Sequence, residues 1–567
     1  MKRALWAWAG FLLWAAAAGE APRVTRGMGG AVASEEETAA RVGIEILKKG
    51  GNATDAAVAV SFALAVTWPE AGNLGGGGFW LSRDPAGKVT AVDFRETAPR
   101  EARSDLYTRP DAKGVTPSSV EGPMASGVPG TVAGLALAHR RGGHLPWRDL
   151  VDPAVRLARD GFPMTENVAA SIAWNRERLA KDAETARIFL PGGAAPVVGS
   201  TFRQPDLAAT LLAIRERGED GFYRGAVART IEEGQVRQRG LISRGDLARY
   251  EARVRPPVRF RFGNAEVLTT PAPSSGPALA EMAILASLVG VEKLRARDVP
   301  SAHWTVEIEK RAFRDRNRFL GDPAFGGVRQ KLFTDLLRLR SIAASIRADR
   351  ATPTPALTGG ESDRPSTTHF SIVDASGGAV SVTTTLNDSF GNARVAPGLG
   401  FLWNDEMDDF TTKPGQKNMY GLVQGKVNAV APGKRMLSAM CPVIVVAGGR
   451  VSLVWGTPGG STIPTTNFQI LLATLLRHES FEAAVAAPRF HQQDLPDTVQ
   501  YERGRFDADW IEGLKRLGHV VVERGGGIYN SGLMGRVNGI ARNADGTWTA
   551  VADPRRSGAA LSVRPSP

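Results

Sequence analysis

The stretch RPSTTHFSIVD, residues 364–374, places two threonines and a histidine at the start of an expected strand. It begins at the end of a segment, 351–366, that is rich in proline, threonine, glycine and serine, a composition typical of an exposed linker. Alternating and β-branched residues follow and predict a strand. Two interpretations fit: ordinary strand threonines, or a self-cleavage site at which Thr367 becomes a new amino terminus held by a sheet.

A freed Thr367 would carry its own base. Its hydroxyl alone is a weak nucleophile, but a free α-amino group has a pKa of roughly 7.7–8.0 and accepts a proton at neutral pH. No histidine or aspartate is then required to remove the hydroxyl proton. Taken alone, the Thr-Thr-His triplet, 367–369, favours ordinary strand threonines, so the cleavage hypothesis depends on the rest of the chain.

The chain changes character at this linker. Before it, residues 34–350 are expected to be mostly helical. Segments with helical spacing, such as 36–51, 54–66 and 299–320, are separated there by a glycine loop at 72–81 and a strand at 88–96. After the linker, strands dominate, and two helices are expected near 466–477 and 506–517. With 567 residues, 43% hydrophobic and 23% charged, the composition is that of a globular protein.

The first 19 residues are predicted to be a secretory signal peptide. Lys2 and Arg3 precede an apolar run, 4–18, and small residues follow it. An uncleaved membrane anchor is the alternative. Because no later segment is apolar for long enough to cross a bilayer, we expect a periplasmic or secreted protein with no stable membrane span after signal cleavage.

Charge and cysteine content exclude some classes of function. The formal net charge is +12, but basic and acidic residues are interspersed, so we expect no nucleic-acid partner. The single cysteine, Cys441, allows no intramolecular disulfide. It stands at the start of an apolar strand, which favours a packing residue over a nucleophile.

Two glycine-rich stretches are candidates for binding through the main chain. In VWGTPGGST, residues 454–462, the amides of Gly459 and Gly460 could stabilise an oxyanion. A simple strand-to-helix turn and a phosphate cradle are the alternatives, and the absence of the Gly-Lys-Ser/Thr ending of a phosphate-binding loop argues against phosphate. The loop at 73–77 also lacks lysine and favours tight backbone packing.

Charged residues suggest a site for a zwitterion. Glu406, Asp408 and Asp409 lie in the stretch 401–415, not far in sequence from Asn387. Histidine at metal-ligand spacing is missing, so the alternatives are a solvated acidic turn or a site for a substrate ammonium. Arg95 ends a strand, where it could form a structural ion pair or bind a carboxylate with two parallel hydrogen bonds.

Together these stretches resemble the γ-glutamyltranspeptidase family of N-terminal nucleophile hydrolases. The resemblance extends in family order from about residue 23 to the C-terminus. It is carried by GNATDAAVAVSFALAV, GNLGGGGF, DFRETAP, SGVPGTVAGL, STTHFSIVD, TLNDSFG, NDEMDDF, KPGQKNMYGL, GKRMLSAMCP, TPGGS and APRFHQQ.

The resemblance implies a mixed α/β (α+β) fold, a four-layer αββα sandwich formed jointly by two subunits of one precursor. Cleavage between Ser366 and Thr367 would give a large subunit, 20–366, and a small subunit, 367–567. The implied roles follow: nucleophile, Thr367; its hydrogen-bond partner, Thr385; oxyanion hole, Gly459 and Gly460; donor carboxylate, Arg95 and Ser438; donor amino group, Asn387, Glu406 and Asp409; lid over the pocket, 411–425 with Tyr420.

The resemblance implies a γ-glutamyltransferase and glutathione hydrolase that needs no cofactor or metal. It would transfer the γ-glutamyl group of glutathione or a related compound to water, an amino acid or a peptide. Ala439 departs from the pattern, because many members have a second serine there. Two alternatives stay open: an acylase of the same fold acting on another amide, such as a β-lactam side chain, and a non-catalytic periplasmic protein that binds γ-glutamyl peptides.

Overall fold

The computed structural model describes residues 21–110, 114–354, 365–524, 532–556 and 558–563. The predicted signal peptide and most of the predicted linker therefore lie outside the described residues. No helix in the described ranges is long and apolar enough to cross a membrane.

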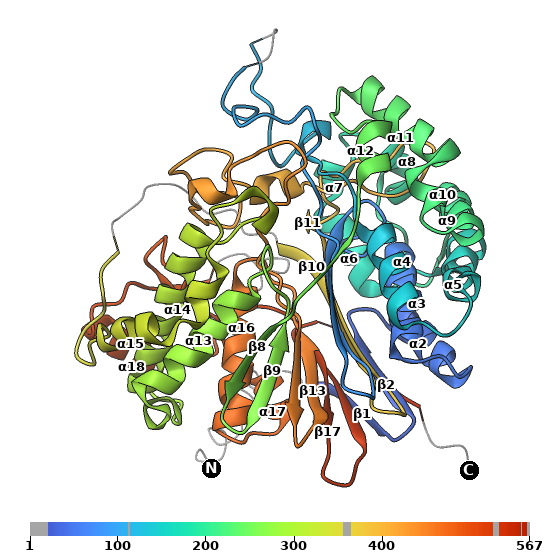
Figure 1. Cartoon of the computed structure of the whole chain (residues 1–567). Coiled ribbons are helices and arrows are strands. Elements are labelled where there is room, and N and C mark those ends of the chain that lie inside the picture. The colour runs from blue at the N-terminus through green and yellow to red at the C-terminus, as the bar shows by residue number, and fades with distance from the viewer. Residues whose placement is uncertain (1–20, 111–113, 355–364, 525–531, 557, 564–567) are drawn as a thin grey trace, which may run out of the picture.

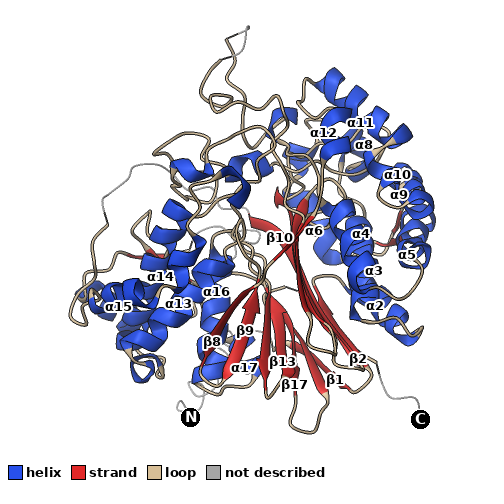
Figure 2. Cartoon of the chain, in the orientation of Figure 1, coloured by secondary structure: helices blue, strands red, loops and turns tan. Residues whose placement is uncertain are grey.

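Two seven-stranded antiparallel sheets lie face to face at the centre of the molecule (Figures 1 and 2). The first has the order β8-β9-β12-β13-β17-β18-β1. Its strands are β1 (Arg23–Gly27), β8 (Val258–Phe262), β9 (Ala265–Thr269), β12 (Val443–Ala447), β13 (Arg450–Gly456), β17 (Asn538–Arg542) and β18 (Trp548–Ala552). The second has the order β7-β4-β3-β11-β10-β2-β19. Its strands are β2 (Gly30–Ser34), β3 (Gly77–Arg83), β4 (Val89–Asp93), β7 (Arg253–Arg255), β10 (Pro365–Asp374), β11 (Ala379–Asp388) and β19 (Ala559–Ser562).

Helices cover the outer face of each sheet, which completes the four layers (Figure 2). Over the first sheet lie α13 (Gly276–Val289), α14 (Val299–Phe319), α15 (Leu336–Ala344), α16 (Thr462–Leu471), α17 (Phe481–Ala486) and α18 (Ala508–Arg516). Over the second lie α2 (Glu37–Lys48), α3 (Ala53–Thr67), α4 (Thr131–Gly142), α5 (Trp147–Asp160) and α9 (Pro205–Arg217). The shorter helices beyond them are α6 (Glu166–Trp174), α7 (Arg176–Leu179), α8 (Ala183–Phe189), α10 (Asp220–Tyr223), α11 (Gly225–Gln238) and α12 (Arg244–Arg249).

Each sheet contains strands from both sides of the 351–366 segment, as the predicted sandwich requires. In the second sheet β10 lies between β2 and β11, so a strand from the second part of the chain pairs with one from the first. Alternation along β10 separates two environments. Phe370 and Ile372 pack in the apolar core that also contains α3. His369 and Ser371 point to the other sheet, where the His369 ring occupies the space that a Cβ on Gly456 of β13 would need.

The sequence predictions for individual elements are mostly confirmed, with two corrections. The helices expected near 466–477 and 506–517 are α16, which continues into a π-helical turn at Leu472–Leu476, and α18. The glycine loop expected at 72–81 is shorter, because β3 begins at Gly77. The first part of the chain, expected to be mostly helical, also supplies strands to both sheets.

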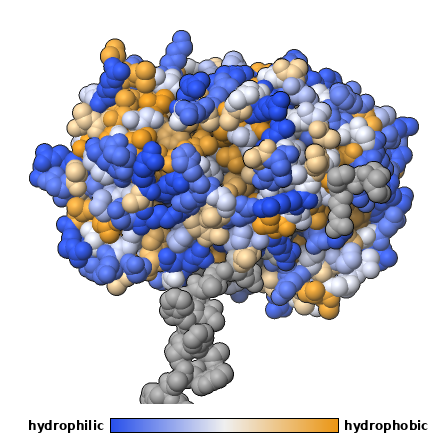
Figure 3. Space-filling model, turned by 90° about the horizontal axis from the view of Figure 1, so that it is seen from below, coloured by the Kyte–Doolittle hydropathy of each residue, from blue (hydrophilic) through white to orange (hydrophobic). Residues whose placement is uncertain are grey.

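The surface is mixed in character. Viewed from below, hydrophilic residues interrupt the hydrophobic ones across the face (Figure 3). Neighbouring surface side chains of opposite charge form ion pairs, such as Arg148 with Glu216 and Arg297 with Glu479. Such exposed pairs contribute little to stability individually.

Candidate active site

A small cavity brings together most of the residues that the sequence singled out. Its volume is about 20 Å³, which is room for about one water molecule. The lining residues are Arg95, Arg316, Thr367, Thr385, Asn387, Asp409, Tyr420, Leu422, Ser438, Ala439, Met440, Gly460 and Ile463. Of the predicted site residues, Glu406 and Gly459 are not in this lining, and the side chain of Ser366 is not among those described.

One wall, which we call the hydroxyl wall, consists of Thr367, Thr385 and Gly460. Thr367 in β10 is buried, and its hydroxyl donates to the hydroxyl oxygen of Thr385 in β11 at 3.3 Å. The same Thr385 oxygen accepts the Asn387 amide at 2.8 Å. These contacts follow from the strand pairing, in which Thr367 lies opposite Thr385.

The pairing of β10 with β11 is irregular at one point. Ser366 pairs with Asn387 but Thr367 pairs with Thr385, so Leu386 is an extra residue on β11. This β-bulge lies at the Ser366–Thr367 bond, and bulges of this kind redirect side chains next to reactive sites. The bond is inside β10, which begins at Pro365, and not in an exposed linker as the sequence suggested.

A glycine turn after β13 closes the hydroxyl wall. Gly459 has φ of +137° and Gly460 has φ of +56°, conformations that L side chains rarely adopt. A Cβ on Gly459 would also meet the Thr462 hydroxyl at 2.5 Å. Among the described residues, neither glycine amide donates to another backbone or side-chain group, so both N–H groups can serve a ligand.

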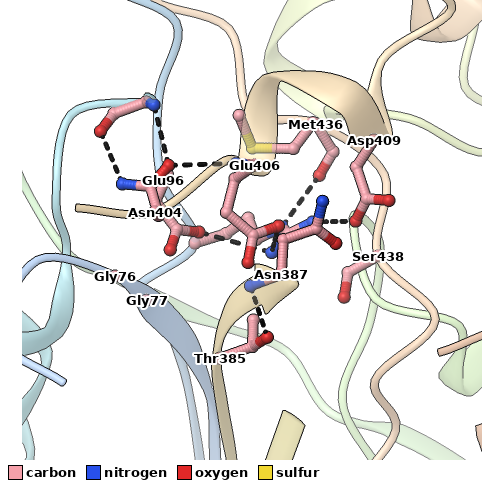
Figure 4. A network of polar contacts seen from close by, with 12 residues as sticks. Gly76, Gly77, Glu96, Thr385, Asn387, Asn404, Glu406, Asp409, Met436 and Ser438 are labelled. Carbon is pink, nitrogen blue, oxygen red and sulfur yellow. Dashed lines mark hydrogen bonds and ion pairs between the residues drawn. The ribbon is translucent and has the colours of Figure 1, made fainter. Parts of the chain in front are cut away.

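A second wall, the charged wall, is formed by Arg95 and Asp409. Figure 4 labels Asp409 with its neighbours Glu406 and Ser438. The Arg95 guanidinium contacts three buried carboxylates: Glu406 at 2.5 Å, Glu96 at 3.3 Å and Asp409. Its Nε also donates to the Met436 carbonyl at 3.3 Å. The one positive charge of Arg95 does not balance the three carboxylates that it contacts in this buried site.

The pKa values of this cluster reflect burial opposed by Arg95. Burial raises the pKa of Asp409 to about 6 and that of Glu96 to about 7, although Arg95 lowers both. Burial also raises the pKa of Glu406 well above its usual value. For Arg95, burial alone would lower the pKa, but Glu406, Glu96 and Asp409 hold it above its usual value. Near neutral pH, Asp409 is therefore the member of this cluster that lines the cavity and ionises within reach of physiological pH.

The acidic stretch is not a solvated turn. Glu406–Asp409 forms a 3-10 turn whose acidic side chains are all buried. Asp408 points away from the cavity lining, where it accepts from the Ser119 hydroxyl at 2.6 Å and the Met419 amide at 2.8 Å. Asp409 alone of the three acids lines the cavity, and Glu406 lies behind it on Arg95.

The segment 411–425, which we call the lid segment, covers the cavity through Tyr420. The phenol oxygen of Tyr420 lies 2.8 Å from the Asn387 carbonyl and 2.9 Å from its side-chain oxygen. Asn387 itself has a left-handed backbone, with φ of +83°, a conformation that asparagine tolerates better than most residues. Its side-chain amide donates to the Asp405 carbonyl at 3.0 Å. The lid tyrosine therefore contacts the end of β11, two residues after Thr385.

Ser438 and Ala439 form the third side of the cavity. The Ser438 hydroxyl oxygen accepts the Met440 amide at 3.2 Å, and the Ser438 carbonyl accepts the Ser275 hydroxyl at 2.6 Å. Ala439 is partly exposed and lines the cavity, so a longer side chain at this position would reach it.

Two arginines at the site were not predicted from the sequence. Arg316 of α14 lines the cavity, donates from Nε to the Ser275 hydroxyl at 2.7 Å, and forms no ion pair within the described ranges. Burial lowers its pKa to about 10, partly offset by Asp409. Arg536 donates to the Thr367 carbonyl at 3.3 Å. Arg316 could not be singled out within the run RAFRDRNR, residues 311–318, because the sequence does not distinguish its arginines and only their positions on the helix do.

The described histidines lie away from the cavity lining. No histidine is among the described lining residues. His369, two residues after Thr367, is held between the Thr383 and Ser371 hydroxyls, and burial lowers its pKa to about 3. Within the same described ranges, no group of three or more His, Cys, Asp or Glu side chains is arranged to hold a metal ion. Cys441 is buried, as the sequence predicted.

This combination of a doubly covered pair of antiparallel sheets and a threonine at the head of a central strand defines the class of N-terminal nucleophile hydrolases, and comparison with known proteins agrees. Residues 39–563 match the gamma-glutamyltranspeptidase family model. The chain therefore belongs to the gamma-glutamyltranspeptidase family and is an enzyme.

Relatives and solved structures cover most of the chain. It is 42% identical over 547 residues to the glutathione hydrolase proenzyme of Pseudomonas aeruginosa, covering 95% of each chain. It is 40% identical over 533 residues to the glutathione hydrolase proenzyme of Escherichia coli, covering 93% of this chain and 90% of the relative. The crystal structure of a cephalosporin acylase from Bacillus halodurans matches with a TM-score of 0.83 at 26% identity, covering 96% of this chain and 97% of that one.

Proposed function

We propose that this protein is an exported γ-glutamyltransferase and glutathione hydrolase that activates itself by cleavage before Thr367. The observation that carries the proposal is that the Thr367 hydroxyl and the Arg95–Asp409 pair line one cavity. A nucleophile is thereby placed opposite a cation and an anion, which is the charge pattern that an α-amino acid presents. The match with two glutathione hydrolase proenzymes supports the same substrate class.

The first step would be cleavage of the Ser366–Thr367 bond by Thr367 itself. The Thr367 hydroxyl attacks the Ser366 carbonyl and the C–N bond breaks, so the peptide becomes an ester and the Thr367 amino group is freed. Water then hydrolyses the ester, which releases the Ser366 carboxylate and restores the Thr367 hydroxyl. Burial of Thr367 inside β10 favours this intramolecular route, because an external protease needs an exposed, extended substrate. The products would be the large subunit, 20–366, and the small subunit, 367–567, held together by the two shared sheets.

In turnover, the freed amino group of Thr367 would accept the hydroxyl proton as the oxygen attacks the γ-carbonyl of the donor. Thr385 holds the hydroxyl in position. The amides of Gly459 and Gly460 would stabilise the oxyanion of the tetrahedral intermediate. The leaving amine takes the proton, and an ester between Thr367 and the γ-glutamyl group remains. Water then releases glutamate, or the amine of an amino acid or peptide takes the γ-glutamyl group.

Donor recognition would use the charged wall. Arg95 and Ser438 would bind the α-carboxylate, and Asn387 and Asp409 the α-amino group, with Glu406 acting from behind through Arg95. Because Arg95 is saturated by carboxylates, one of its ion pairs must open for a substrate carboxylate to bind. The substrate ammonium lowers the free-energy cost of opening this ion pair, because it provides Asp409 with a second cation.

An acylase acting on another amide is the second candidate. Two observations favour it: the high structural similarity to a cephalosporin acylase, and Ala439, which removes one hydroxyl from the carboxylate side. The buried Asp409 in the cavity lining argues for a donor with an ammonium group instead.

Three anilide donors separate the candidates. The γ-glutamyl anilide carries both the α-amino and α-carboxylate groups, the glutaryl anilide lacks the amino group, and the 4-aminobutyryl anilide lacks the carboxylate. A charge-assisted hydrogen bond contributes about 1.5–3 kcal/mol, so we expect kcat/KM for the γ-glutamyl anilide to exceed both others by about tenfold or more. A glutaryl anilide that reacts equally well or better would support the acylase.

Export depends on the first residues of the chain. The positive start at Lys2 and Arg3 and the following apolar run support a cleaved signal. We expect the expressed full-length protein to be recovered outside the cytoplasm with an N-terminus near residue 20. Recovery in the cytoplasm with Met1 or Lys2 still in place would contradict export without affecting the enzyme assignment.

A further inference from the structure

Tyr420 is held from a second side by a segment far from the lid. The side-chain nitrogen of Gln493 donates to the backbone carbonyl of Tyr420 at 3.1 Å and to that of Leu495 at 3.2 Å. Its side-chain oxygen lies 2.8 Å from Nε2 of His491. Gln493 is only 3% exposed, so these contacts are shielded from water. The Tyr420 carbonyl of the lid segment is therefore bound by the buried side-chain amide of Gln493.

The orientation of the Gln493 amide is fixed by its surroundings. Two carbonyls at the nitrogen end require N–H donors, so the oxygen must face His491. His491 then donates from Nε2, and its Nδ1 accepts from the Thr465 hydroxyl at 2.8 Å. Burial lowers the pKa of His491 to about 4, which agrees with this neutral form. The Thr462 carbonyl, 3.0 Å from the Thr465 hydroxyl, competes with His491 Nδ1 for its one proton. The orientation of Gln493 does not depend on that choice, because a flipped amide would place its oxygen against two carbonyl oxygens.

This chain of contacts joins the lid to the hydroxyl wall from both sides. Thr465 lies in the first turns of α16, directly after the Gly459–Gly460 turn. On the other side, the Tyr420 phenol lies on Asn387, whose amide binds the Thr385 hydroxyl next to Thr367. A change at Gln493 could thus reach the cavity by two routes, through Tyr420 of the lid or through His491 and Thr465 beside the glycine turn, and the split between KM and kcat distinguishes them.

We propose that Gln493 is a positioning residue that latches the lid segment over the donor site. The proposal rests on the proposed γ-glutamyl function for its kinetic consequence, but the latch itself is a property of the fold. Losing the latch leaves Thr367, Thr385 and Arg95 in place and increases the fraction of molecules with an open lid. Donor binding then weakens more than the chemical step, and water reaches the acyl-enzyme more easily.

The test compares Gln493→Met with Gln492→Met. Methionine keeps the length of the side chain and removes its donors. Gln492 is equally buried but donates to Asp497 at 3.1 Å and accepts the Asp494 amide at 2.9 Å, so it is a neighbouring control that does not contact the lid in the described structure. Both variants are purified as full-length protein and checked for processing and thermal midpoint.

Two readouts follow. Lys417 lies in the lid segment and is a trypsin site, whereas Lys413 precedes proline and resists trypsin. Because a buried hydrogen bond contributes about 1 kcal/mol net, loss of the one donor to the lid carbonyl should speed cleavage after Lys417 by about fivefold in Gln493→Met. KM for the γ-glutamyl anilide should rise about three- to tenfold, with kcat changed less than about twofold, and the ratio of hydrolysis to transfer should increase.

Unchanged trypsin cleavage after Lys417 in Gln493→Met would overturn the latch, as would a fall in kcat at constant KM. Equal effects in both variants, or loss of processing in Gln493→Met alone, would assign Gln493 to general stability or maturation and would also overturn it. Faster cleavage after Lys417 in a protein without γ-glutamyl activity would support the latch and contradict the proposed function, so the two failures are distinguishable.

Discussion

The hydroxyl wall and the charged wall meet in one cavity but are positioned by different forces. Thr367, Thr385 and Gly460 are set by strand register, a β-bulge and two left-handed glycines, all of which are main-chain features. Arg95 and Asp409 are set by ion pairs among buried side chains from segments far apart in the sequence. We therefore expect the geometry of the hydroxyl wall to persist when nearby charges change. The geometry of the charged wall should change when one of its side chains gains or loses a proton or a charge.

Asp409→Asn is expected to have the largest effect of the changes that distinguish the two walls. Removing one partner of a buried charge pair costs about 2–5 kcal/mol, so kcat/KM for the γ-glutamyl anilide should fall by about 30-fold or more. Glutaryl anilide, which has no ammonium, should be affected much less. The control is Asp374→Asn, since Asp374 is also buried but lies at the other end of β10, outside the cavity lining. Equal losses for both donors would mean that Asp409 only supports the fold.

Arg95→Lys should have the next largest effect. Lysine keeps the charge but not the planar fork that reaches several carboxylates at once. We expect kcat/KM to fall about tenfold or more for γ-glutamyl and glutaryl donors through KM, with cleavage before Thr367 intact. The 4-aminobutyryl anilide, which lacks the carboxylate, serves as the control. An unchanged KM for the γ-glutamyl anilide would make Arg95 a structural ion-pair partner only.

The pH dependence of kcat/KM distinguishes the roles of the two walls without a mutation. Burial raises the pKa of Asp409 to about 6, so the ionised form that binds an ammonium is lost as pH falls through 6. The Thr367 amino group titrates for every donor alike. The ratio of kcat/KM for γ-glutamyl over glutaryl anilide should therefore rise about tenfold between pH 5 and 7. A ratio that stays flat would show that Asp409 is not the ammonium partner.

Ala439→Ser is expected to give the smallest effect and the opposite sign. A hydroxyl added at this partly exposed, cavity-lining position can donate to a carboxylate. KM should fall about three- to tenfold for γ-glutamyl and glutaryl donors and stay constant for the 4-aminobutyryl donor. If all three donors respond alike, position 439 does not face the carboxylate, and the role proposed for Ser438 would lose its support.

The hydroxyl wall could be predicted because its signals are local. A linker, a Ser-Thr-Thr triplet at a strand start and a Pro-Gly-Gly turn are each visible in a few consecutive residues, and the strand pairing then brings Thr367 to Thr385. The prediction that the linker extends to Ser366 was wrong, because β10 begins at Pro365. Composition marks a linker but not the residue at which a strand begins.

The charged wall could be predicted only in part. Sequence reasoning selected Arg95, Glu406 and Asp409 but expected them to bind opposite ends of a substrate, whereas the structure pairs them with one another. It also overlooked Glu96 and Arg316. Such arrangements depend on which buried charges meet after folding, and no local pattern records that.

Intact mass spectrometry of the purified protein tests the central claim most directly. Wild type should give two species that divide the chain between Ser366 and Thr367, with Thr367 as the new N-terminus, without added protease. Thr367→Ala should give one uncut and inactive chain. A Thr367→Ala protein that still divides at this bond, or a fully active wild type that remains a single chain, would contradict the account.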